Sequence, residues 1–154
     1  MLSDIEIAKC FINATANILS TMAGLEAQPG RPFVKKVTEA SGDVSAIVGV
    51  TGAKRGTIAV SFSQGCAIGL VKGMLGDDIE DIVQDTQDAV GEITNMVSGQ
   101  ARAALAEKGL VLQGATPSVI MGKNHVIKHV TSSPVMAIPF STEHGPFVVE
   151  FCLE

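Results

Sequence analysis

A carboxylate and a carboxamide stand one helical turn apart in this 154-residue chain. Glu92 precedes Asn95 by three residues, and Asp88 precedes Glu92 by four. Side chains at i, i+4 and i+7 share one face of an α-helix. A carboxylate accepts hydrogen bonds and pairs with cations, whereas a carboxamide donates and accepts hydrogen bonds without carrying charge. We therefore expect this face to perform the chemistry of the protein, although Glu-x-x-Asn alone also fits an ordinary solvated helix.

Residues 81–108 are predicted to form the helix that positions these side chains. Its apolar residues fall mainly on another face, as in an amphipathic helix packed on a core: Val90, Ile93, Val97, Ala101, Ala104 and Leu105. The segment lacks proline, and Lys108-Gly109 is typical of a helix end. Asparagine is a poor helix former, so Asn95 in mid-helix costs some stability. The small residues Ser98 and Gly99 would leave the polar pair accessible to a docking partner.

Three other polar segments favour structural roles. The acidic residues in 77–81 suit the start of a helix, where the helix dipole stabilises negative charge. His125 and His129 are four residues apart, but their segment has an extended pattern and no third metal ligand is evident. Residues 49–56 are rich in glycine, yet Lys54 is not followed by Ser or Thr and no helix follows, so a phosphate-binding loop is not indicated.

Composition and charge argue against several classes of function. A net charge of −5 and the absence of Trp and Tyr disfavour nucleic-acid binding. No stretch approaches the roughly 18 apolar residues of a membrane span. The acidic N-terminus lacks the features of a signal peptide. Cys10, Cys66 and Cys152 are an odd number without C-x-x-C spacing, which is typical of buried, reduced thiols in a cytoplasmic protein.

The remaining pattern predicts a mixed fold. Residues 4–23 form a helix that Ser3 and Glu6 can cap, and residues 65–75 form a second helix. Strands are expected at 33–39, 44–51 and 56–63 before the long helix. After it come residues 111–113 and 117–121, a short strand around 126–130, and the segments 134–141 and 147–153, so that the order of elements is αβββααβββ. We expect an α+β fold with a mostly antiparallel, six-stranded sheet and helices packed on one face.

A weak internal repeat divides the chain. Residues 13–20 align with residues 91–98, so that Asn17 matches Asn95 while Ala14 takes the place of Glu92. Each of these helices precedes a β-rich segment. We expect one domain, residues 1–154, built from a duplicated αβββ unit with halves at about 1–76 and 77–154, of which only the second keeps its acid.

The pattern Asp88-x-x-x-Glu92-x-x-Asn95, followed by Pro117, resembles the CheC/CheX/FliY family of chemotaxis phosphatases. It is most similar to CheX-type members. Other matching segments are the first helix (FINATANILSTMAG), the strand 56–62 and the helix end 72–76. CheX-type members carry one active signature and CheC-type members commonly two, so the missing acid of the first copy favours the CheX type. Pro117 lies about one residue nearer to Asn95 than in the family pattern.

The resemblance implies hydrolysis of the aspartyl-phosphate of a CheY-like response regulator. In that reaction the regulator supplies Mg²⁺ and a lysine, and this chain needs no cofactor or metal of its own. Asn95 would orient the attacking water, and Glu92 would pair with the partner's lysine. Asp88 would aid docking or orient the helix surface. The small residues Ser98 and Gly99 are expected to form part of the docking surface.

The resemblance also implies a homodimer whose sheet continues across the subunits. Two other interpretations stay open at the level of sequence. One is an adaptor that holds a regulator or a flagellar-switch component without hydrolysis, through the same helix face. The other is a small-ligand sensor, for which the chain offers no distinct pocket motif.

Overall fold

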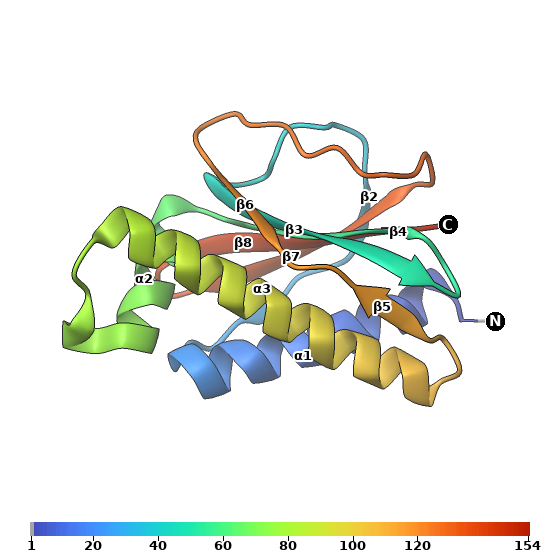
Figure 1. Cartoon of the computed structure of the whole chain (residues 1–154), viewed down its shortest axis with the longest axis horizontal. Helices are drawn as coiled ribbons and strands as arrows, with labels where there is room; N and C mark the ends of the chain where they lie inside the picture. The colour runs from blue at the N-terminus through green and yellow to red at the C-terminus, as the bar shows by residue number, and fades with distance from the viewer. Residues whose placement is uncertain (1) are drawn as a thin grey trace.

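Three α-helices and eight strands make up the protein, which we describe from a computed structural model covering residues 2–154 (Figure 1). In chain order the elements are α1 (Asp4–Ala23), β1 (Gln28–Pro29), β2 (Phe33–Lys35), β3 (Val44–Gly52), β4 (Gly56–Phe62), α2 (Gln64–Leu75), the 3-10 helix η1 (Gly76–Asp78), α3 (Ile82–Glu107), β5 (Leu112–Gly114), β6 (Ser118–Met121), β7 (Val135–Thr142) and β8 (Gly145–Leu153). The predicted α+β class is confirmed.

All strand pairs are antiparallel, and the sheet runs β1-β7-β8-β4-β3-β5. The prediction of six strands was wrong, because the sheet has eight. Each edge strand is split in two: β1 and β2 both pair with β7, and β5 and β6 both pair with β3. Prolines mark both breaks, Pro32 before β2 and Pro117 before β6, since proline lacks the N–H donor that a continuous ladder needs.

The helices pack on one face of the sheet, as predicted. In Figure 1 they lie below the strands, with α3 crossing the front of the molecule. One cluster of buried apolar side chains joins both layers. Within it the ring of Phe11 on α1 stacks on that of Phe151 on β8 at 5.1 Å between centroids. The central strand β8 therefore holds α1 by close aromatic contact.

Two loops cover the opposite face of the sheet, residues 36–43 and 122–134, seen above the strands in Figure 1. The expected strand at 126–130 was wrong, since its only strand-like contact is an isolated bridge between Val126 and Glu39. The segment crosses the sheet instead of joining it. The strand expected at 33–39 is also shorter and ends at Lys35, where its ladder with β7 stops.

The two split edge strands occupy similar places in the chain. β1 and β2 follow α1, whereas β5 and β6 follow α3, and they lie at opposite edges of the sheet. The duplication of an αβββ unit stays a prediction, and the order of elements is compatible with it. Over residues 2–154, no helix combines the length and the apolar character that crossing a membrane requires.

Candidate functional site

The acidic segment before α3 caps this helix. Asp81 Oδ1 accepts hydrogen bonds from the backbone N–H groups of Val83 and Gln84, at 3.1 and 3.3 Å. Asp85 Oδ2 accepts from the backbone N–H groups of Glu80 and Asp81, at 2.9 and 3.2 Å. Carboxylates thus satisfy donors at the helix start that have no partner within the helix. The interpretation as the start of the long helix is confirmed for Asp81, which is the N-cap, whereas Asp77 and Asp78 lie in the 3-10 helix η1.

The predicted helix is confirmed as α3, with Asp81 as N-cap and Lys108 as C-cap. Its inner face is buried against the core through Ala89, Val90, Ile93, Val97, Ala101 and Leu105. The long apolar contact fixes the axis of the helix, because every turn from Thr86 to Leu105 contributes at least one buried side chain. The polar face that α3 carries is therefore held by a rigid support.

Asp88, Glu92 and Asn95 are exposed on the outer face of α3, as their spacing predicts. Gln84 Nε2 donates a hydrogen bond of 3.0 Å to Asp88 Oδ1 one turn earlier, which limits the rotamers of that carboxylate. Asn95 points to solvent from the middle of the helix and is open to a second protein. The structure thus brings together a carboxylate and a carboxamide one turn apart on an accessible surface.

Ser98 does not lie on that surface. The prediction that Ser98 lies on the docking surface was wrong, because its side chain is fully buried. Its Oγ accepts a hydrogen bond of 3.1 Å from Arg102 Nε. It stands on the flank of α3 that packs beside β5 and β6. Gly99 is half-buried, and its role in docking stays a prediction.

Arg102 is a residue of this face that sequence reasoning missed. It follows Asn95 by seven residues, a spacing of two helical turns that keeps it on the same face. The signal was present in the sequence, since Arg102 is the only Lys or Arg between Lys72 and Lys108.

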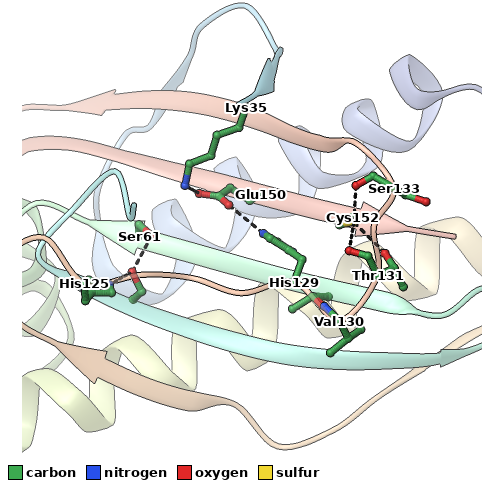
Figure 2. A network of polar contacts seen from close by, with 11 residues as sticks. Lys35, Ser61, His125, His129, Val130, Thr131, Ser133, Glu150 and Cys152 are labelled. Atoms are coloured by element: carbon green, nitrogen blue, oxygen red, sulfur yellow. Dashed lines mark hydrogen bonds and ion pairs between the residues drawn. The ribbon is translucent and has the colours of Figure 1, made fainter. Parts of the chain in front are cut away.

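The two predicted structural histidines lie on the opposite side of the sheet (Figure 2). His125 Nε2 is 2.6 Å from Ser45 Oγ, and His129 Nε2 is 3.0 Å from Glu150 Oε1. They serve to fasten the loop 122–134 over the strands. Across residues 2–154, no three His, Cys, Asp or Glu side chains gather in a way that suits a metal ion.

The same side of the sheet buries a charged group. The Glu150 carboxylate is 1% exposed and also receives Lys35 Nζ at 2.6 Å. Burial raises the pKa of this carboxyl, but hydrogen bonds and positive charge from His129 and Lys35 outweigh it, so that the pKa lies below its usual value. All three cysteines are buried and free, and burial raises the pKa of the Cys66 thiol.

A sequence profile of the family described as "Chemotaxis phosphatase CheX" matches residues 44–141, more than half of the chain. The crystal structure of a chemotaxis protein CheX from Desulfovibrio desulfuricans is 68% identical, with a TM-score of 0.92 over 97% of this chain and 99% of that one. The CheY-P phosphatase CheX of Thermotoga maritima is 24% identical over 139 residues, 90% of this chain and 88% of that protein.

A similar fold, with a TM-score of 0.81 and 23% identity, occurs in the CheX–CheY–BeF3–Mg²⁺ complex from Borrelia burgdorferi, covering 97% of this chain and 99% of that one. Profile, relatives and fold agree over most of the molecule. The chain belongs to the family of the chemotaxis phosphatase CheX.

Proposed function

We propose that this protein is a phosphatase that hydrolyses the aspartyl-phosphate of a CheY-like response regulator. The observation that carries the proposal is the exposed pair Glu92 and Asn95 on the rigid outer face of α3. Its family supports the proposal, since the Thermotoga maritima relative is a CheY-P phosphatase. So does the Borrelia burgdorferi complex, in which a CheX is bound to CheY.

The reaction needs little covalent help from the enzyme. Water attacks phosphorus, the bond from phosphorus to the aspartyl oxygen breaks, and the aspartate leaves as a carboxylate. Both protons of the attacking water end on the released phosphate, which forms as H2PO4−. Because an acyl phosphate is already activated, the remaining task is to hold water in line with the breaking bond.

Asn95 suits that task. Its carboxamide can accept a hydrogen bond from the water and donate another without adding negative charge beside the phosphoryl group. The helix places it at the surface, so that it can enter the active centre of another protein.

Glu92 has a different role in this proposal. A carboxylate next to a phosphoryl group is repelled, so Glu92 pairs with the lysine of the regulator and fixes α3 over its site. Asp88 assists docking one turn earlier. Mg²⁺ belongs to the regulator, where it neutralises phosphoryl oxygens.

The experiment is the decay of a phosphorylated receiver domain with and without this protein. Wild type should accelerate phosphate release. The Asn95→Ala variant should accelerate phosphate release about 100-fold less than wild type does. Its thermal unfolding and its binding to the receiver should stay near those of wild type. Binding without acceleration would instead select a non-catalytic adaptor, and unchanged decay without binding would reject both functions.

We also propose that the protein acts in the cytoplasm as a homodimer. The edge strand β2 leaves Phe33 45% and Val34 47% exposed, and its outer side has no partner strand among residues 2–154. A second copy that continues the sheet would cover both features. Sedimentation of wild type and Val34→Lys tests this, since a monomeric wild type would contradict it.

A further inference from the structure

Arg102 places one positive charge on the same face of α3 as the proposed catalytic pair. It lies two turns beyond Asn95, about 10 Å along the helix axis. Helical side chains lean toward the N-terminus, so the guanidinium approaches the pair. Arg102 Nη2 lies 4.0 Å from where a Cβ of Gly99 would stand. Gly99 therefore places no side chain between this cation and the turn that carries Asn95.

Contacts with Ser98 and with strand β5 hold the guanidinium of Arg102 in place. Its Nε donates a hydrogen bond of 3.1 Å to Ser98 Oγ, and Ser98 is fully buried, so that the acceptor has a fixed position. The guanidinium carbon of Arg102 lies 2.9 Å from where a Cβ of Gly114 would stand, because β5 passes close beside it. Arg102 is thus preorganised by a buried serine and a strand glycine, in contrast to a freely moving surface arginine.

The charge of Arg102 has no partner within residues 2–154. The ion pairs there involve Lys35, His129 and His144. One helical turn from Arg102 in each direction stand residues without charge: Ser98, Gly99, Leu105 and Ala106. A guanidinium has five N–H donors, and the bond to Ser98 uses one. A fixed cation with free donors on an exposed face is suited to bind a carboxylate through two hydrogen bonds.

We propose that Arg102 binds a carboxylate of the receiver domain at the rim of its phosphorylation site. The inference rests on the proposed function and assigns a docking residue to it. Two helical turns separate Arg102 from the position of the attacking water, so Arg102 acts on binding and orientation and not on the attack itself. Ser98 is a positioning residue that acts through Arg102.

The test measures phosphate release from the phosphorylated receiver against the concentration of this protein. Arg102→Gln should raise the half-saturating concentration about tenfold, with a maximal rate within about twofold of wild type. Ser98→Ala keeps the charge of Arg102 but frees its guanidinium, and should raise the half-saturating concentration by less than Arg102→Gln does. Added salt should weaken binding to the receiver more for wild type than for Arg102→Gln.

Arg55→Gln is the matched control, because it removes the same charge from the exposed turn between β3 and β4. It should leave both kinetic parameters unchanged. Thermal unfolding of all variants shows that the fold is retained. An Arg102→Gln curve that overlays wild type, or one in which only the maximal rate falls, would overturn the inference.

A second measurement separates this inference from the proposed function. Binding is titrated with the receiver domain carrying beryllofluoride and Mg²⁺, which requires no hydrolysis. If wild type binds without accelerating phosphate release, the phosphatase proposal fails, and weaker binding by Arg102→Gln still supports the docking role. If wild type accelerates release and Arg102→Gln binds equally well, only the docking role fails. No binding by wild type rejects both.

Discussion

Lys35 Nζ lies 2.6 Å from Glu150 Oε2, and this ion pair joins the edge strand β2 to the central strand β8. Both side chains are nearly inaccessible, at 5% and 1% exposed. The other oxygen of the carboxylate receives His129 from the loop 122–134 (Figure 2). One buried carboxylate therefore connects the sheet edge, the sheet centre and the covering loop.

We predict that Glu150→Gln lowers the free energy of unfolding by about 3 kcal/mol, because it leaves the ammonium of Lys35 buried without a counter-charge. The double variant Lys35→Met, Glu150→Gln should lose less than the sum of the two single variants. Chemical unfolding of the four proteins of this cycle measures the coupling. Additive losses would show that the pair is not coupled.

The lowered pKa of Glu150 predicts a dependence of stability on pH. The unfolded carboxyl titrates near its ordinary value of 4.5, whereas the folded carboxyl titrates below it. The unfolded state therefore takes up the proton first, and the stabilisation present above pH 4.5 is lost as the pH falls through the folded pKa. Unfolding in acid should be less pH-dependent for Glu150→Gln than for wild type. The exposed variant Glu26→Gln should follow the wild-type curve.

Substitutions of Glu92 and Asn95 should affect different quantities, the affinity for the receiver and the maximal rate. Glu92→Ala removes an expected ion pair with the regulator, so binding should weaken about tenfold or more and activity should fall with it. Asn95→Ala should lower the maximal rate and leave binding nearly intact. Titration of the receiver domain and single-turnover phosphate release distinguish the two effects. Equal losses of affinity in both variants would contradict the division of roles.

Two helical glycines should respond oppositely to alanine. A Cβ at Gly73 would lie 2.0 Å from the backbone oxygen of Ala23, so α1 and α2 must shift apart, and Gly73→Ala should cost about 1–3 kcal/mol. A Cβ at Gly99 meets nothing nearer than 4.0 Å. Gly99→Ala should therefore gain about 1 kcal/mol from helix propensity. Thermal unfolding of both variants tests how closely the helices pack.

The helices could be predicted because their signals are local. Ser3 and Glu6 form the reciprocal capping bonds of α1 at 3.2 and 3.0 Å, and Gly24 ends the helix with a φ of 63°. Spacing alone also placed Asp88, Glu92 and Asn95 on one face. These features depend on residues within a turn or two of each other, so the sequence contains them.

The predictions from sequence failed where contacts between residues far apart in the chain determine the structure. The segment 126–130 has a strand-like composition, but its partners lie on β4 and β8, far away in the sequence. Together with the bond from His125 to β3, they hold it across the sheet. Glu150 alternates along β8 as a surface residue would, yet it is buried because the same loop covers it. No local pattern indicates which face of a strand a distant loop will cover.

The amino-acid sequence by itself determined α3 and the direction of its polar face, since helical periodicity is set by the backbone. Tertiary structure decided which flanks of that helix stay open. Because β5 and β6 pack beside α3, Ser98 is buried and holds Arg102, while Asn95 remains at the surface. Burial depends on which elements meet, and only the folded chain brings them together.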